Sequence, residues 1–377
     1  MSSESGANTH VWPDWLPLRK DLKGQSPYGA PQLPLEVKLN TNENPFSLSP
    51  DLVAKLAAAI ASSAENFNRY PDRDAIELRT ELANYLNSTT GAKLEADQIW
   101  AANGSNEIIQ TLFLAFAGAG VNSLGFTPSY SMHENISRST GTNWIVGARL
   151  GDFNIDVPSA LTQISKEKPK LVFITTPNNP TGTSTEISDI RKIVEATAQV
   201  GGLAIIDEAY AEFSDQPSTI ELLRDYLNLV VIRTMSKAFS FAGVRVGYLA
   251  AAKEVIEALQ LVRLPYHLST PTQLLAKVAL EFQGELLAEV EQLKIERNKV
   301  VGELQALGLN VVPSSANFLL FSVENEKKVW QELVDLGVLV RDVGIVGHLR
   351  VTIGTPKEND RFLVALREIL RTLKGEK

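Results

Sequence analysis

The middle of the chain alternates short, continuous apolar runs with segments in which apolar residues recur at helical spacing. Residues 171–175, 203–206 and 229–233 are apolar runs of strand length, and residues 187–199 have the spacing of an amphipathic helix. Continuous apolar strands joined by helical crossovers are typical of a parallel sheet that helices cover on both faces. The pattern predicts an α/β fold with a mostly parallel central sheet flanked by helices.

The pattern changes after about residue 263, where a second and smaller unit is predicted. A chain of 377 residues exceeds the usual size of a single core, so two domains are expected. We predict an arm with part of the small domain over residues 1–50, a large domain over 51–262 and a small α+β domain over 263–377. The remaining predicted helices are 52–62, 75–87, 285–307, 329–336 and one at the C-terminus, and the strands of the small domain are 318–321, 338–341 and 349–353. A pocket between two domains is the default place for a ligand site.

Composition and charge narrow the function classes. The formal net charge is −8 and the Lys and Arg residues are dispersed, which argues against nucleic acid as a partner. The chain has no cysteine, which excludes disulfides and thiolate metal sites, and its four histidines lack ligand spacing, so no metal is predicted. The sequence has neither a signal-peptide pattern nor an apolar stretch of membrane-spanning length. We therefore expect a cytoplasmic protein without a membrane partner.

Polar clusters follow three of the predicted strands, at the ends where ligands bind in α/β sheets. Asn179 lies in Asn-Asn-Pro-Thr-Gly, Asp207 and Tyr210 lie in Asp-Glu-Ala-Tyr, and Lys237 lies in Thr-Met-Ser-Lys-Ala-Phe. An acid at the buried end of a strand needs a positive partner, which a protonated pyridine nitrogen would provide. A lysine among Met, Ala and Phe is poorly solvated, which favours a lowered pKa and a nucleophilic amine. Each cluster taken alone also fits an ordinary turn, cap or loop.

Two further pairs of residues have the chemistry of a phosphate site. Ser236 and Arg245 follow the third strand, and an arginine presents a planar fork that matches two phosphate oxygens. Ser105 and Asn106 come directly after a glycine turn and open an apolar-periodic segment. The N-terminus of such a helix offers unpaired N–H groups and a positive dipole end, although a plain helix cap would have the same sequence.

Four motifs in order, Asn-Pro-Thr-Gly, Asp-Glu-Ala-Tyr, Ser-Lys and Arg-Val-Gly, resemble those of the aminotransferases among the fold-type I enzymes that depend on pyridoxal 5′-phosphate (PLP). The resemblance implies a large domain with a mostly parallel sheet, a smaller α+β domain, and PLP held as a Schiff base on Lys237. It implies catalytic roles for Lys237, Asp207 and Tyr210. The cofactor-binding residues that it implies are Ser105, Asn106, Tyr130, Asn179, Asp207, Tyr210, Ser236, Lys237, Arg245 and, from the neighbouring subunit of a homodimer, Tyr70.

Further segments resemble the histidinol-phosphate aminotransferase family over nearly the whole chain, with details similar to its actinobacterial branch. These segments are residues 39–45, 68–71, 105–106, 128–130, 236–239, 264–267 and 349–354. The resemblance implies transamination of L-histidinol phosphate with 2-oxoglutarate, which becomes glutamate, in histidine biosynthesis. It implies that Arg350, Arg341, Tyr28 and Asn179 bind the substrate.

Other functions fit the same cofactor residues. An aromatic amino acid aminotransferase would share all of them, and relative rates with histidinol phosphate and phenylalanine would separate the two. A PLP-dependent lyase or decarboxylase would differ in that no oxo acid returns its cofactor to the aldehyde. A non-catalytic binding protein is disfavoured, because the whole set of cofactor residues is present and the sequence contains no appended DNA-binding segment.

Overall fold

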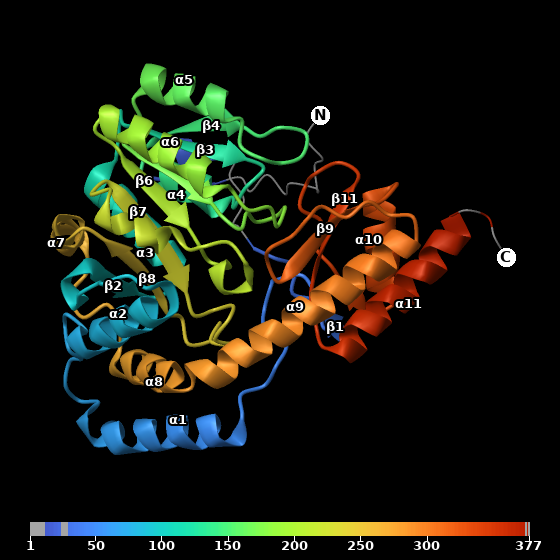
Figure 1. The fold of residues 1–377 in the computed structure, drawn as a ribbon, viewed down its shortest axis with the longest axis horizontal. Coiled ribbons are helices and arrows are strands. Elements are labelled where there is room, and N and C mark those ends of the chain that lie inside the picture. The colour runs from blue at the N-terminus through green and yellow to red at the C-terminus, as the bar shows by residue number, and fades with distance from the viewer. Residues whose placement is uncertain (1–11, 24–28, 374, 376–377) are drawn as a thin grey trace.

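The computed structural model describes residues 12–23, 29–373 and 375. A seven-stranded sheet with helices on both faces forms the larger part, and a smaller group of helices and strands lies beside it, at the far end of the long helix α9 (Figure 1). The strand order is β2-β8-β7-β6-β5-β3-β4, in which β8 runs antiparallel to both of its neighbours and all other pairs are parallel. The predicted α/β fold with a mostly parallel sheet is confirmed.

The elements of the larger part follow the predicted alternation. Its strands are β2 (Ile99–Ala102), β3 (Asn122–Thr127), β4 (Asn143–Ala148), β5 (Leu171–Thr175), β6 (Leu203–Asp207), β7 (Leu229–Thr234) and β8 (Gly247–Ala251). Its helices are α1 (Pro50–Ser63), α2 (Ile76–Thr90), α3 (Ser105–Phe116), α4 (Met132–Ser139), α5 (Val157–Glu167), α6 (Ile187–Gln199), α7 (Lys253–Val262) and α8 (Thr270–Glu281). Short 3-10 helices cover Lys20–Leu22, Ala64–Asn66, Ala96–Gln98, Ala211–Phe213 and Thr219–Arg224.

Alternate residues of the central strands enter two different cores, which is why these strands are apolar throughout. On β5, Phe173 belongs to a core that also contains residues of α3, α4 and α7, whereas Val172 and Ile174 belong to a second core that contains residues of α2, α5 and α6. The sheet is thus covered on both faces. The carboxyl ends of β3, β5, β6 and β7 are left at one common edge.

The smaller part contains β1 (Val37–Lys38), β9 (Phe318–Ser322), α10 (Glu326–Asp335), β10 (Val338–Leu339), β11 (His348–Thr352) and α11 (Pro356–Leu373), and α9 (Gln283–Ala306) connects it to the larger part. Strand β11 pairs antiparallel with β9, and β1 of the N-terminal arm pairs parallel with β10. The predicted strand 338–341 was too long, because β10 ends at Leu339. Arg341 instead forms an isolated antiparallel bridge with Arg350, since the chain turns away from β1 to reach β11.

The contacts of α8 bear on the division of the chain into domains. This helix follows the predicted boundary at residue 262, yet it packs against α1 and α2 of the larger part. The chain then leaves the larger part along α9, which reaches the smaller part and contacts β9 and α11 there (Figure 1). We therefore propose that the boundary lies within α9. None of the helices among the described residues is both long and apolar enough to cross a bilayer.

Candidate active site

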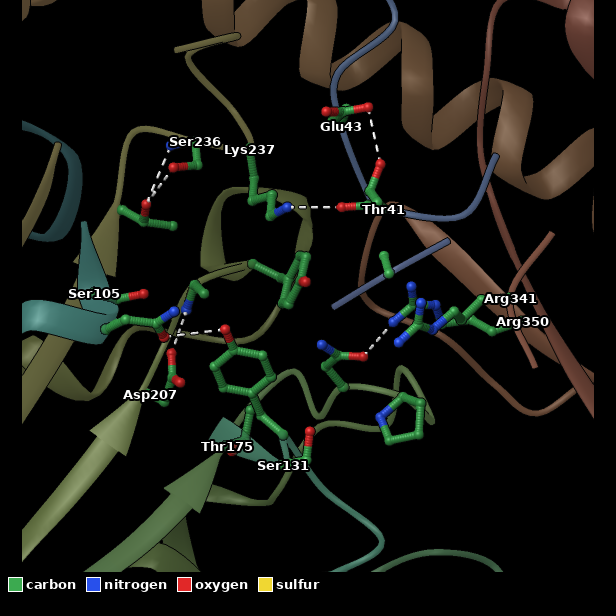
Figure 2. A pocket seen from close by; sticks show the side chains of 18 of the residues that line it. Thr41, Glu43, Ser105, Ser131, Thr175, Asp207, Ser236, Lys237, Arg341 and Arg350 are labelled. Atoms are coloured by element: carbon green, nitrogen blue, oxygen red, sulfur yellow. Dashed lines mark hydrogen bonds between the residues drawn. The ribbon is translucent and has the colours of Figure 1, made fainter. Parts of the chain in front are cut away.

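A cavity of about 420 Å³ lies where the carboxyl ends of the central strands face the smaller part. It brings together side chains from the larger part, from the N-terminal arm and from β11, as Figure 2 shows. Most of the residues singled out from the sequence line it. They are Ser105, Asn106, Tyr130, Asn179, Asp207, Tyr210, Ser236, Lys237, Arg245, Arg341 and Arg350.

Lys237 follows β7 and is held at the cavity by its own hydrogen bond. Its Nζ donates to the backbone oxygen of Thr41 at 3.0 Å (Figure 2). Burial of the amine, together with the positive charge of Arg350, lowers the pKa of Lys237 to about 8, against a smaller opposing effect of Glu43. A lowered pKa leaves a larger share of the amine neutral near physiological pH, as nucleophilic and proton-accepting amines require.

Asp207 is the last residue of β6 and is only 2% exposed. Its Oδ2 lies 3.1 Å from Nε2 of His133 on α4, and its Oδ1 accepts a hydrogen bond from the N–H of Ala209. Within the described part of the chain, no Lys or Arg pairs with this carboxylate. A buried acid of this kind is suited to hold a cationic group of a ligand at the base of the cavity.

The N-terminus of α3 forms a cradle that has room for an anion. Gly104 caps this helix with φ +86°, and the helix has no side-chain cap. A Cβ on Gly104 would lie 2.6 Å from Nη2 of Arg245, and one on Gly247 would lie 2.4 Å from the backbone nitrogen of Ser105. Only glycine permits this close approach of the arginine to the helix N-terminus. The cradle therefore fits a phosphate group, which free helical N–H groups and a guanidinium both bind well.

Aromatic and amide side chains form the walls of the cavity. Tyr130 donates from its hydroxyl to Oδ1 of Asn106 at 3.0 Å, and the hydroxyl of Tyr210 accepts from Nδ2 of Asn42 at 2.9 Å. Asn179 accepts a hydrogen bond from Arg350 through its Oδ1. The walls thus present donors and acceptors in fixed orientations.

Arg341 and Arg350 lie next to each other at the small-domain side of the cavity (Figure 2). Their backbones exchange two hydrogen bonds of 2.9 Å, and directly opposed residues of an antiparallel pair project to the same face. Arg350 is 6% exposed and also donates to the backbone oxygen of Asn40. The Nη1 of Arg341 is buried and has no hydrogen-bond partner among the described residues. Two neighbouring guanidinium groups, one with an unsatisfied donor, are suited to an anionic substrate group.

One residue singled out from the sequence, Tyr70, does not line this cavity. Tyr70 is 80% exposed and stacks on Tyr266, with ring centroids 4.5 Å apart. Tyr28 lies outside the described residues. The cavity of a single chain therefore lacks Tyr70.

Some residues of the site have roles that the sequence reasoning did not assign. They are Thr41, Asn42 and Glu43 of the arm and His133 of α4. The arm residues belong to segment 39–45, which is one of those that resemble the family, so the sequence indicated that this segment matters. His133 has no motif around it, and only the packing of α4 against the sheet places it beside Asp207.

The sequence profile of the family described as "Aminotransferase class I and II" matches residues 36–366. The chain belongs to this family. The match spans both parts of the molecule and includes every residue that lines the cavity except Ala30. Class I and II aminotransferases use PLP, and the cradle, Asp207 and Lys237 fit the phosphate, the ring nitrogen and the aldehyde of this cofactor.

Individual class I and II aminotransferases resemble the chain closely. The histidinol-phosphate aminotransferase of Mycolicibacterium smegmatis is 53% identical over 359 residues, covering 95% of this chain and 94% of that protein. That of Corynebacterium diphtheriae is 53% identical over 356 residues, covering 94% and 96%. The solved structure of the histidinol-phosphate aminotransferase from Clostridium acetobutylicum shares the fold, with a TM-score of 0.80, 24% identity and coverage of 89% of this chain and 99% of that one. That from Sinorhizobium meliloti in complex with PLP has a TM-score of 0.79, 23% identity and coverage of 90% and 92%.

Proposed function

We propose that the protein transfers the amino group of L-histidinol phosphate to 2-oxoglutarate, with PLP as cofactor, in histidine biosynthesis. Support comes from relatives named histidinol-phosphate aminotransferase, whose similarity covers nearly the whole length of the chain. The observation that carries the proposal is the pair Arg341 and Arg350, whose guanidinium groups lie side by side at the cavity. A phosphate ester brings a dianion into the site, and charge-assisted hydrogen bonds from arginine are its strongest ligands.

The cofactor would be bound by groups on three sides of the cavity. Its phosphate would lie in the cradle of Ser105, Asn106, Ser236 and Arg245, and Tyr130 would stack on the ring. Asn179 and Tyr210 would hydrogen-bond the ring 3-oxygen. When bound, the cofactor supplies an electron-accepting ring that stabilises negative charge on the substrate Cα.

The chain's own groups would then position the substrate and move the proton. The Lys237 amine takes the proton from the substrate Cα, and its lowered pKa suits this exchange near neutral pH. Asp207 keeps a proton on the ring nitrogen through its negative charge, with His133 fixing the carboxylate. Arg350 and Arg341 hold the substrate phosphate, which orients the Cα–H bond toward the lysine. The same arginines would bind a carboxylate of 2-oxoglutarate.

The test compares catalytic efficiency with histidinol phosphate, histidinol and phenylalanine. We expect Arg341→Ala and Arg350→Ala each to lower kcat/KM for histidinol phosphate by about ten- to a hundredfold, the usual effect of losing a hydrogen bond to a charged group. Histidinol without its phosphate should be a poor substrate of the native protein. As a control, Arg367→Ala removes an arginine that pairs with Glu303 at the surface, and it should leave all three efficiencies unchanged.

The alternative function is judged by the same measurement. If the native protein prefers phenylalanine, or handles histidinol as well as its phosphate ester, the aromatic aminotransferase hypothesis replaces the present one. Return of the cofactor to its aldehyde form by 2-oxoglutarate would separate both from a lyase or decarboxylase.

A homodimer with shared sites is part of the proposal. The exposed stack of Tyr70 and Tyr266, with exposed Leu264 close by in the chain, presents apolar surface of the kind that protein interfaces bury. We propose that this surface meets a second copy and that Tyr70 enters the partner's cavity near the cofactor phosphate. The cytoplasmic location stays a prediction.

A further inference from the structure

A buried chain of hydrogen bonds connects β11 of the smaller part to Tyr210 through Asn42. Asn42 is 2% exposed, and its Nδ2 donates to the Tyr210 hydroxyl at 2.9 Å. Its Oδ1 accepts from the hydroxyl of Thr352 at 3.0 Å, and its backbone N–H donates to the same hydroxyl at 3.0 Å. Tyr210 follows β6 and Thr352 ends β11, so these hydrogen bonds join the two parts of the molecule at the cavity.

The hydrogen-bond pattern fixes the orientation of the Asn42 amide. A threonine hydroxyl has one proton, and that of Thr352 accepts from the Asn42 backbone and gives its proton to Oδ1. In the flipped orientation, the Thr352 oxygen would face two N–H donors, and its own proton would lose the acceptor that it has now. Since Thr352 is itself buried, that loss would be costly.

The orientation of the amide decides where the Tyr210 proton points. A phenol carries one proton, and here its oxygen already accepts a hydrogen bond from Asn42. The hydroxyl proton is therefore directed away from Asn42. Tyr210 lines the cavity, and its ring rests edge-on against Phe318, which limits the positions of the hydroxyl.

We propose that Asn42 is a positioning residue that keeps the Tyr210 hydroxyl as a donor to the ring 3-oxygen of the cofactor. The inference rests on the proposed function, because it takes from there the contact between Tyr210 and that oxygen. Asn42 acts through Tyr210, and Thr352 in turn sets the orientation of Asn42. In this way a residue of the smaller part determines the polarity of a hydrogen bond made by the larger part.

The backbone at Asn42 explains why this position carries an asparagine. Its φ is +56°, in the left-handed region, and its carbonyl accepts a hydrogen bond from Nδ2 of Asn317 at 3.1 Å. Asparagine and aspartate tolerate this conformation better than most residues, and glycine adopts it freely. Asn42→Asp and Asn42→Gly therefore change the side chain while sparing the backbone.

The experiment measures the pH midpoint of the visible absorbance change of the lysine-bound cofactor in the holoenzyme. The Tyr210 donor stabilises the negative ring oxygen, and this matters most when the linking nitrogen has lost its proton. Tyr210→Phe should therefore raise the midpoint by about one pH unit, the size expected for a hydrogen bond to a charged group. Asn42→Asp offers a carboxylate that accepts the Tyr210 proton, so it should raise the midpoint by a similar amount.

The double variant separates this effect from the added charge. Once Tyr210 has lost its hydroxyl, Asn42→Asp should raise the midpoint little further, and spectroscopic titration should show the same cofactor affinity as for Tyr210→Phe alone. Equal shifts with and without the Tyr210 hydroxyl would mean that the charge acts directly and would overturn the proposal. If Asn42→Asp does not fold, Asn42→Gly is measured in its place. A rise in the midpoint of Asn42→Gly supports the proposal, and an unchanged midpoint overturns it.

Further variants distinguish failure of this inference from failure of its premise. Thr352→Val removes the hydroxyl that orients Asn42 and should raise the midpoint, whereas Thr352→Ser keeps the hydroxyl and should not. If Tyr210→Phe itself leaves the midpoint unchanged, the contact between Tyr210 and the ring oxygen is wrong, and this inference falls with it. If Tyr210→Phe shifts the midpoint but neither Asn42 variant does, the proposed function stands and only the role of Asn42 is rejected.

Discussion

Single side chains at the site acquire their chemistry from their surroundings. Burial of the Lys237 amine and the positive charge of Arg350 both disfavour the protonated form of this amine. Asp207 is only 2% exposed, and among the described residues its carboxylate contacts only the His133 side chain and the N–H of Ala209, so it retains capacity for a cationic group. The same residue types on the surface would remain ordinary charges.

The lowered pKa of Lys237 predicts how cofactor attachment depends on pH. Only the neutral amine attacks an aldehyde, so the attachment rate of the apoprotein should rise with pH through a midpoint of about 8, well below the ordinary lysine value of 10.5. Arg350→Gln removes a charge that lowers this pKa, and should move the midpoint to higher pH. Arg341→Gln is the matched control, because Arg341 has no part in the shift. Stopped-flow absorbance after mixing apoprotein with PLP measures the attachment rate of each protein as a function of pH. Identical midpoints in the native protein and in Arg350→Gln would contradict the prediction.

The charge of Asp207 should matter for turnover more than for cofactor binding. Asp207→Asn keeps the shape of the side chain but loses the negative charge that holds a proton on the ring nitrogen. We expect PLP to bind while kcat falls on the order of a hundredfold or more, as for other losses of one preorganised electrostatic contact. Absorbance spectra and steady-state rates check this. Unchanged turnover would reduce Asp207 to a structural cap of β6.

Among the elements, α3 contributes its N-terminus and two glycines give access to it. Gly104 and Gly247 let Arg245 and β8 approach the first turn of this helix more closely than any Cβ would allow. The positive end of the helix and the guanidinium therefore act on one point of the cavity. The positive potential at this point belongs to α3 as a helix, since no single residue of its first turn creates it.

Gly104→Ala tests the cradle, and Gly120→Ala is its matched control. Both glycines have φ near +80°, so either substitution should cost about 1–2 kcal/mol of stability from backbone strain alone. Only at Gly104 would the new Cβ meet Arg245, at 2.6 Å from Nη2, while at Gly120 nothing lies within 4 Å. We expect similar falls in melting temperature of the apoproteins but a loss of PLP affinity, about tenfold, for Gly104→Ala alone. Equal affinities would show that Arg245 does not hold the phosphate.

At the scale of the whole molecule, the proposed dimer would complete the site of each chain with a residue of the other. Tyr70 lies at the surface, outside the cavity of its own chain, in a stack with Tyr266. The proposed dimer would bury this stack and bring Tyr70 to the partner's cofactor phosphate.

Mixed dimers test the shared site. Tyr70→Ala and Lys237→Ala chains should each have little activity, because every site of either homodimer lacks one group. Subunit exchange would produce hybrids in which one of the two sites has both native groups, so activity should return to at most half of the native value per hybrid. Activity and the fraction of tagged hybrids are measured together. Verified hybrids without recovered activity would show that Tyr70 does not act across the interface.

Sequence alone determined the parallel sheet, because alternating apolar runs and helical segments are local patterns. It also indicated Lys237, Asp207 and Arg245, since the groups proposed to handle the cofactor belong to short motifs at strand ends. Only the tertiary structure decided which distant residues support them, as in the contact between Asn42 and Tyr210 across 168 positions and that between His133 and Asp207 across 74. It likewise shortened the strand predicted at 338–341, through the pairing of Arg341 with β11. Such contacts depend on how whole elements pack, and neither periodicity nor motif spacing records that packing.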